Sequence, residues 1–338
     1  MGAGIFGLSV AYACAARGAR VRVCDSRGIG AGSSGGIVGA LAPHVPENWN
    51  AKKAFQLGSL LMAQEFWDRV DSLSGLKAGY ARTGRLQSIA DDRAVALAKA
   101  REESAADLWG DHARWKVVPS GSFEFEPASP TGQLVHDTLS ARIHPRKACQ
   151  SLAAAIKALG GEIEIGGSSG NGPTVWATGF EGLLQMNTET GRSVGNGVKG
   201  QAVLLGHDAS SAPQLFSNGL HIIPHADGTT SIGSTSEREF SDPTATDDQV
   251  NDLLNRAMAT CPSLQNAPVL ERWAGVRPRA KSRAPMLGVW PDKPGQFIAN
   301  GGFKIGFGMA PKVGQVMADL VLENTDTIPD GFRVEDNF

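Results

Sequence analysis

The chain of 338 residues is 41% hydrophobic and 20% charged, a composition and length typical of a globular protein with two joined domains. Its net charge of -2 excludes a general attraction to nucleic acid or to an anionic membrane. No apolar run reaches the length of a membrane-spanning helix, so no span is predicted. The four cysteines are scattered, which predicts reduced thiols in a cytoplasmic protein and no metal site.

The chain begins with a glycine fingerprint of the form G-x-G-x-x-G, made by Gly2, Gly4 and Gly7. A helix is predicted over 8–17 and a short strand over 19–24, which Asp25 closes. The first glycine permits a tight turn, the second admits a pyrophosphate, and the third lets the helix pack on a sheet. Asp25 stands where a carboxylate can accept both hydroxyls of an adenosine ribose. The alternative is a structural glycine turn.

The fingerprint is expected to follow a buried strand, yet only Met1 precedes Gly2. In a doubly wound sheet this strand is central and has neighbours on both sides. Each buried backbone group that loses its partner costs about 1–3 kcal/mol. We therefore expect the native start to lie upstream behind an apolar β-run, another segment to fill the slot, or the site to be damaged. The chain as written is expected to bind a dinucleotide weakly or not at all.

The remaining elements follow from periodicity and from glycine and proline positions. Helices are predicted over 50–73, 91–108, 147–159, 247–261 and 311–323. Strands are predicted over 82–89, 162–165, 174–177, 199–205, 220–224, 229–233 and 296–299. Glycine-rich segments at 30–43 and 301–308 are predicted to be a loop and a turn at which the backbone approaches a ligand. The return to a βαβ pattern near residue 162 predicts the α/β class.

Several short motifs are spread over nearly the whole chain: GAGIFGLS at the start, RTGRL at 82–86, IHPRK at 143–147, WAGVRPR at 273–279 and GGFKIGFGMAP at 301–311. In this order the chain resembles the FAD-dependent D-amino-acid oxidase and glycine oxidase family. The resemblance implies a doubly wound, Rossmann-like FAD-binding domain and an α+β substrate domain with a mostly antiparallel sheet. The first would comprise 1–45, 136–190 and 275–338, and the second 46–135 and 191–274.

The same resemblance implies that FAD is held mainly by backbone groups. The implied cofactor-binding residues are Gly2, Gly4, Gly7, Asp25, Ser26, Ser33, Ser34, Gly39, Ala40, Leu41, Ile163, Ala177, Thr178, Gly179, Gly301, Gly302, Phe303, Lys304, Ile305 and Gly306. The turn at 301–306 would approach the pyrimidine edge of the flavin. N–H groups of the helix turn that follows can stabilise negative charge on reduced flavin there.

The implied activity is oxidation of the C–N bond of an amino acid or secondary amine, with oxygen or an electron-transfer partner as acceptor. Lys304 stands where relatives carry a carboxylate-binding arginine, and its alternative role is a solvated lysine. Arg277 is a second anchor or an ion-pair partner between domains. His221 either faces the substrate or is structural, and His44 either lines the site or caps a turn.

Two other functions remain open at the level of the sequence. The first is a nicotinamide-dependent dehydrogenase, although such an enzyme has no need for the second glycine turn at 301–306. The second is a non-catalytic or cofactor-poor member of the same fold, which only the short N-terminus favours. Bound flavin and its reduction by an amine distinguish the leading prediction from both.

Overall fold

One large β-sheet and three small ones organise the chain, which the computed structural model describes over residues 1–338. The first small sheet is a parallel pair, β1 (Arg22–Asp25) with β7 (Glu162–Ile165). In the second, β15 (Gln296–Asn300) is central: it runs parallel to β8 (Thr174–Trp176) and antiparallel to β14 (Met286–Val289). Parallel strands alternating with helices confirm the predicted α/β class.

The first two residues connect the β1–β7 pair to the β14–β15–β8 sheet. The Gly2 N–H donates to the Cys24 carbonyl at 2.7 Å, and the Ala177 N–H donates to the Met1 carbonyl at 2.8 Å. The Met1 amine donates to the Val175 carbonyl at 2.8 Å. Neither β1 nor β8 has a second strand as neighbour, so the expectation that another segment fills the slot is wrong.

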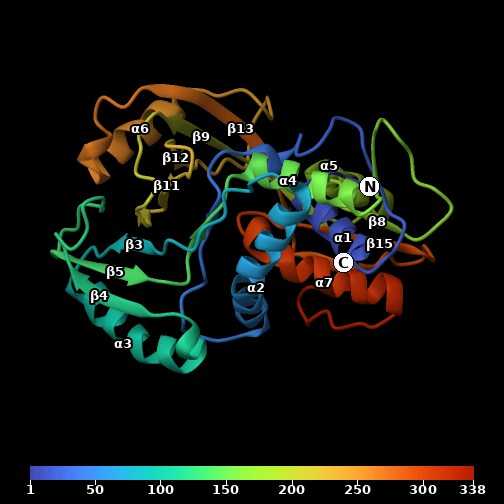
Figure 1. Ribbon diagram of the computed structural model, residues 1–338, viewed down its shortest axis with the longest axis horizontal. Helices are drawn as coiled ribbons and strands as arrows, with labels where there is room; N and C mark the ends of the chain where they lie inside the picture. The colour runs from blue at the N-terminus through green and yellow to red at the C-terminus, as the bar shows by residue number, and fades with distance from the viewer.

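Three helices surround these strands: α1 (Ile5–Ala15), α4 (Pro145–Ala158) and α7 (Gly306–Glu323). Helix α1 is buried almost all round, and a Cβ added at Gly314 of α7 would lie only 2.7 Å from the Ser9 carbonyl oxygen. The two backbones therefore pack closely, which the apolar and small residues of α1 permit. Figure 1 shows α1 between the strands and α7, with both chain ends on this side of the molecule.

The predicted start of the last helix at residue 311 is wrong, because α7 begins at Gly306 and contains Pro311. The glycines that suggested a continuing turn serve helix packing instead. A Cβ at Gly308 would meet Leu60 of α2 (Ala51–Ser74) at 3.5 Å, an ordinary van der Waals contact. Helix α2 lies in a range predicted for the substrate domain, yet it packs against α4 and α7. The domain boundaries stay a prediction.

The large sheet has eight strands in the order β13-β9-β12-β11-β10-β3-β5-β4, drawn on the left of Figure 1. In that order they are Val269–Ala280, Gly195–Leu205, Thr230–Gly233, Leu220–Pro224, Gln214–Ser217, Arg85–Ser88, Gln133–Asp137 and Trp115–Pro119. All neighbours are antiparallel except β10 and β3. Apolar side chains of α6 (Gln249–Thr260) pack on β9, β11 and β12, and α3 (Asp92–Trp109) packs on β4.

The fold thus has two bodies: the large sheet with α3 and α6, and the small sheets with α1, α4 and α7. The other elements are short and lie around these two bodies. They are α5 (Gly179–Thr190), β2 (Ala40–Leu41), β6 (Ala141–Arg142) and the 3-10 turns Ser33–Gly35, Gly110–His112, Pro262–Leu264 and Glu335–Asn337. Asn50 and Asp91 cap α2 and α3 by accepting the N–H groups of Lys53 and Ala94. None of the helices combines the length and apolar composition that crossing a bilayer requires.

Candidate active site

The N-terminal glycine turn is packed so tightly that side chains are excluded. Gly2 has φ +100°, and a Cβ there would lie 2.3 Å from the Ala177 carbonyl oxygen. A Cβ at Gly7 would lie 1.9 Å from the Gly2 carbonyl oxygen. The Ser34 hydroxyl accepts the Ile5 N–H at 2.9 Å and would be 3.1 Å from a Cβ at Gly4. The turn therefore holds the positive N-terminal end of α1 and the Ser34 hydroxyl together, as an anion site requires.

Asp25 lies beside this turn at the end of β1. Its Oδ2 accepts the Ala3 N–H at 2.8 Å, and its Oδ1 accepts the N–H groups of Arg27 and Gly28 at 2.8 and 2.9 Å. Burial acts to raise the pKa of Asp25, but these three donors hold the pKa below its ordinary value. Asp25 is therefore an ionised acceptor tied to the glycine turn.

We expect Asp25→Ala to weaken cofactor retention, because the Ala3 N–H loses its acceptor and the glycine turn loses a support. The change leaves up to three N–H groups without a partner, and each costs about 1–3 kcal/mol where water cannot reach it. The measurement is the flavin content of the purified protein, with Asp92→Ala on the exposed start of α3 as the control. Equal flavin occupancy in the variant and the parent would rule out this role.

Two other predicted cofactor residues lie near Asp25 with different surroundings. Ser26 is exposed. Ile163 pairs with Val23 in the parallel register of β1 and β7, and its side chain is partly buried. The structure thus brings the backbone of Ile163 close to the end of β1, whereas the Ser26 side chain faces solvent.

The second glycine turn, residues 301–306, lies directly against the first. A Cβ at Gly302 would be 2.8 Å from the ring of Phe6 on α1. Gly301 has φ +76°, and its N–H donates to the Asn300 side-chain oxygen at 2.8 Å. The Asn300 amide donates to the Gly179 carbonyl at 2.9 Å, which ties this turn to the segment containing Ala177 and Thr178. Phe303, Lys304 and Ile305 then lead into the N-terminus of α7 at Gly306.

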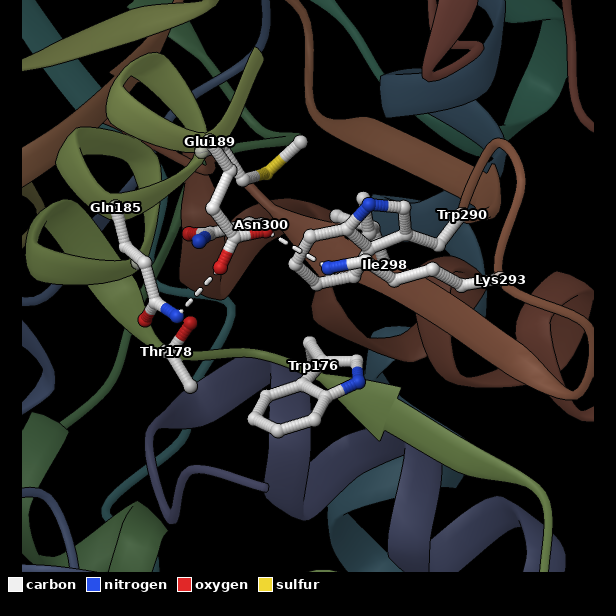
Figure 2. Close-up of a pocket in the computed structure, with 10 residues that line it drawn as sticks. Trp176, Thr178, Gln185, Glu189, Trp290, Lys293, Ile298 and Asn300 are labelled. Carbon is white, nitrogen blue, oxygen red and sulfur yellow. Dashed lines mark hydrogen bonds and ion pairs between the residues drawn. The ribbon is translucent and has the colours of Figure 1, made fainter.

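A small cavity of about 70 Å³ lies behind Thr178 and Asn300 (Figure 2). Figure 2 shows Trp176 and Trp290 on its walls and the ion pair between Lys293 and Glu189, at 2.7 Å, across it. None of the four predicted substrate-binding residues lines this cavity. The charged side chains predicted for substrate binding, Arg277 and Lys304, lie instead beside the turn at 301–306.

The glycine-rich loop after the first unit is fixed from both sides. A Cβ at Gly39, which has φ +71°, would lie 1.8 Å from the Ile143 carbonyl oxygen, and Ala40 and Leu41 pair with β6. On the side of the large sheet, the Ser231 hydroxyl donates to the Val38 carbonyl at 3.1 Å. The predicted residues Ser33 to Leu41 therefore form a rigid connection between the two bodies.

A buried histidine completes the connection between the loop and the large sheet. His225 is 1% exposed, its Nε2 is 2.8 Å from the Ile37 carbonyl oxygen, and its ring centroid is 4.9 Å from that of His144. Burial lowers the pKa of His225 to about 4, and the nearby His144 and Arg142 act in the same direction. The Ile37 carbonyl and Asp227 oppose this shift. His225 is therefore neutral at pH 7.

The lowered pKa of His225 predicts acid sensitivity. Unfolding returns the pKa to about 6.5, so the stabilisation is complete above that pH and is lost as pH falls toward 4. At about 1.4 kcal/mol per pKa unit, the loss is on the order of 3 kcal/mol. We expect His225→Gln, which keeps a donor for Ile37, to flatten the fall in melting temperature between pH 6.5 and 4. Superimposable pH profiles of parent and variant would contradict this.

Arg277 lies on β13, and its guanidinium is directed back across the sheet. It donates to the carbonyl of Thr235 at 2.7 Å, to the carbonyl of Lys199 at 3.2 Å and to the Ser234 hydroxyl at 3.3 Å. A Cβ at Gly200 would lie only 1.4 Å from its Nη2, so glycine at this position makes the space that the guanidinium occupies. Burial lowers the pKa of Arg277 to about 10, which leaves it charged at pH 7.

Three cations surround the ring of Phe303. The Cζ atoms of Arg277 and Arg279 lie 5.9 and 5.7 Å from its centroid, and the Lys304 Nζ lies 5.7 Å from it. The Phe303 N–H donates to the Pro278 carbonyl at 2.9 Å, which attaches the turn to β13. Burial, followed by the charge of Arg277, lowers the pKa of Lys304. Lys304 and Arg277 therefore lie together at the second glycine turn.

The two predicted histidines lie in different places. The ring of His221 packs against that of Phe216, with centroids 4.7 Å apart and the planes tilted by 49°, and its Nδ1 has no partner. Burial, then the charges of Arg85 and Lys304, lowers the pKa of His221 to about 3, so it is a neutral ring beside the cations. His44 instead contacts Gln56 of α2 through its backbone N–H, at 2.8 Å, and its Nδ1. The charge of Lys304 therefore acts on the pKa of His221, whereas the charges that act on the pKa of His44 are those of Lys52 and Lys53 on α2.

Sequence reasoning did not find every residue that shapes this region. Arg279 follows Arg277 at the two-residue spacing of one strand face, a pattern that is also typical of a solvated edge strand. Gly200 carried no local signal, because its role depends on a guanidinium that reaches it from the neighbouring strand. No group of three or more histidine, cysteine or acidic side chains is arranged to hold a metal ion.

Comparisons with known proteins agree with this geometry. Residues 1–320 match the family model described as FAD dependent oxidoreductase. The chain is 29% identical to glycine oxidase of Pseudomonas putida, over 95% of this chain and 93% of that protein. It is 24% identical to glycine oxidase of Geobacillus kaustophilus, over 95% and 91% of the two chains.

Solved structures give the same fold. The crystal structure of the Geobacillus kaustophilus glycine oxidase matches with a TM-score of 0.86 at 20% identity, covering 98% of this chain and 96% of that one. Iminodiacetate oxidase from Chelativorans sp. matches with a TM-score of 0.84 at 20% identity, covering 98% and 97% of the two chains. Because the family match spans nearly the whole sequence, the chain belongs to the FAD-dependent oxidoreductases.

Proposed function

We propose that this enzyme oxidises the C–N bond of an amino acid or secondary amine to an imine, which water then hydrolyses. The observation that carries this proposal is that the glycine turns at 2–7 and 301–306 are in contact and that cationic side chains lie beside the second one. The glycine oxidases that resemble the chain along nearly its full length support an amino acid as substrate.

The residues present fit the FAD that the family uses. A Cβ would strike backbone at Gly2 and Gly7 and the side chains of Ala280 and Phe6 at Gly301 and Gly302, so at both turns a ligand can contact main chain that carries no side chain. The N-terminus of α1 and Ser34 would bind the pyrophosphate, and Asp25 the adenosine ribose. The start of α7 would lie at the flavin. When bound, FAD supplies the acceptor for the hydride that leaves the carbon bearing the amine.

The side chains of the chain would act mainly by orienting the substrate. Lys304 and Arg277 would bind carboxylate, which fixes the carbon bearing the amine against the cofactor. His221 is a neutral ring and would form a wall of the site without adding a further charge. The first N–H groups of α7, at Gly306 and Phe307, have no acceptor within the helix and can stabilise negative charge.

The two bodies of the fold would have different roles, one in binding FAD and the other in binding the substrate. We propose that the parallel strands with α1, α4 and α7 bind FAD, while the large sheet supplies the substrate side through β11 and β13. The electron acceptor that reoxidises the flavin would be oxygen or an electron-transfer partner. All four cysteines are buried and unpaired, which supports work in the cytoplasm.

The products test the reaction directly. The FAD-loaded protein is incubated with amino acids and N-methyl amino acids in air, and the 2-oxo acid and the ammonia or methylamine released are quantified. The proposal predicts equal amounts of the carbonyl product and of the amine, in proportion to substrate consumed. Dependence of turnover on added nicotinamide nucleotide, with no amine released, would favour a nicotinamide-dependent dehydrogenase instead.

A further inference from the structure

The three cations around Phe303 lack carboxylate partners. Neither Arg277, Arg279 nor Lys304 has a carboxylate oxygen within 4.0 Å, whereas the neighbouring Lys199 is paired with Glu237 at 3.7 Å. Glu237 also accepts the Thr235 hydroxyl and the Gln201 amide, at 3.2 Å for the latter, so it is already engaged. The region beside the second glycine turn therefore carries an excess of positive charge.

Among the arginines of this chain that are removed from water, some have carboxylate partners, whereas the buried Arg142 donates to the carbonyls of Ser210 and Pro224. Arg85 contacts Asp137 at 2.9 Å, and Arg101 contacts Glu47 at 2.6 Å. Arg277 likewise has only neutral oxygens as partners, but it differs from Arg142 in lying beside two further cations, Arg279 and Lys304. Arg277 and Arg279 are partly buried and Lys304 is exposed, so their like charges repel one another with no carboxylate between them, and this favours binding of an anion. Because more than one of these cations lacks a carboxylate, a ligand with more than one anionic group is favoured.

The cations are also held at separate positions. Arg277 is fixed by two backbone carbonyls and by the space above Gly200, whereas Lys304 approaches the Phe303 ring from the turn itself and is exposed. Arg279 follows Arg277 on the same strand face and pairs across to Gly302. One carboxylate that binds the Arg277 fork would leave Lys304 and Arg279 without an anion.

We propose that the substrate carries two carboxylates, one bound by Arg277 and the other by Lys304, with Arg279 adding to the positive field. The enzyme would thus prefer an acidic amino acid or an N-carboxyalkyl amino acid to a neutral one. The preference for acidic substrates in turnover rests on the function proposed above, whereas the binding of two carboxylates can be tested without turnover.

The binding test uses two molecules of nearly equal shape, succinate and its monoamide succinamate. Their dissociation constants are measured on the FAD-loaded protein from the perturbation of the flavin spectrum or from the melting temperature. A charged contact replaced by an amide predicts about ten- to hundredfold tighter binding of succinate. Equal binding of the two compounds, or no binding of either, would overturn the proposal.

Variants assign the second carboxylate. Lys304→Met is expected to remove most of the preference for succinate while the protein keeps its FAD, and Lys293→Met, at the separate cavity of Figure 2, is the control. A Lys304→Met protein with the parent's preference would contradict the assignment to Lys304. If Lys304→Met releases FAD, the cation serves the cofactor and the proposal is wrong.

Turnover then separates this proposal from the proposed function. Aspartate is compared with asparagine, and glutamate with glutamine, in both enantiomers. A preference of at least about tenfold in kcat/KM for an acidic member supports two carboxylates. Oxidation of neutral amino acids with no such preference would overturn the proposal and leave amine oxidation standing. Tight succinate binding with no amine oxidised would instead contradict the proposed function alone.

Discussion

Gly7→Ala is expected to abolish stable FAD binding: the dissociation constant for FAD should rise by at least about a hundredfold. The added Cβ would lie 1.9 Å from the Gly2 carbonyl oxygen, and this contact is with backbone rather than with a flexible side chain. Relief requires the turn to move away from α1, which displaces the N–H groups that face the pyrophosphate. Flavin content after reconstitution and the dissociation constant for FAD measure the effect.

Gly308→Ala is the matched control for this substitution. It also adds one methyl group to a helix of the same body, but the only neighbour is Leu60 at 3.5 Å, an ordinary contact. Alanine favours a helix over glycine by about 1 kcal/mol, so this variant should fold and retain FAD. FAD binding by Gly7→Ala equal to that of Gly308→Ala would show that the turn tolerates displacement and would refute the account of the fingerprint.

Gly200→Ala is expected to raise KM or the dissociation constant of a carboxylate ligand by about ten- to hundredfold while FAD is retained. A Cβ at this position would lie 1.4 Å from the Arg277 Nη2, and the three nearest atoms all belong to the Arg277 guanidinium. The side chain can move without disturbing the strand, so folding is preserved and the anchor is lost. The estimate corresponds to one charge-assisted contact of about 1.5–3 kcal/mol.

Two controls keep this prediction specific. Gly172→Ala, in a loop where an added Cβ meets nothing within 4 Å, should change neither FAD content nor carboxylate binding. Arg277→Met should reproduce the loss seen with Gly200→Ala, and the double variant should add little, because both changes remove the same contact. Additive losses in the double variant would mean that Gly200 acts by a route other than Arg277.

Local patterns were sufficient for most of the fold. The spacing of apolar residues predicted a helix over 50–73, and α2 occupies Ala51–Ser74 with Asn50 as its cap. The position of Asp25 followed from its distance to the glycine fingerprint, and the structure adds three N–H donors that no pattern specifies. The start of α7 was misplaced, since a glycine in a turn and a glycine in a packed helix look alike in the sequence.

The site was less accessible to sequence reasoning, for a physical reason. The group formed by Arg277, Arg279 and Lys304 depends on the turn at 301–306 being bonded to β13, a contact between distant segments. The space above Gly200 depends on the register of β9 against β13. His44 is a residue whose position after a glycine-rich loop suggested a site, whereas its tertiary contact is Gln56 of α2.

The most direct test of the central claim is anaerobic reduction of the bound flavin. The chain is loaded with FAD, oxygen is removed, and the visible flavin absorbance is followed as amines are added alongside hydroxy acids of the same skeleton, such as alanine and lactate. The account predicts that at least one amino acid or secondary amine bleaches the flavin, and that the matching hydroxy acid and reduced nicotinamide do not. A bound flavin that no amine reduces, or that only nicotinamide or hydroxy acid reduces, would contradict it.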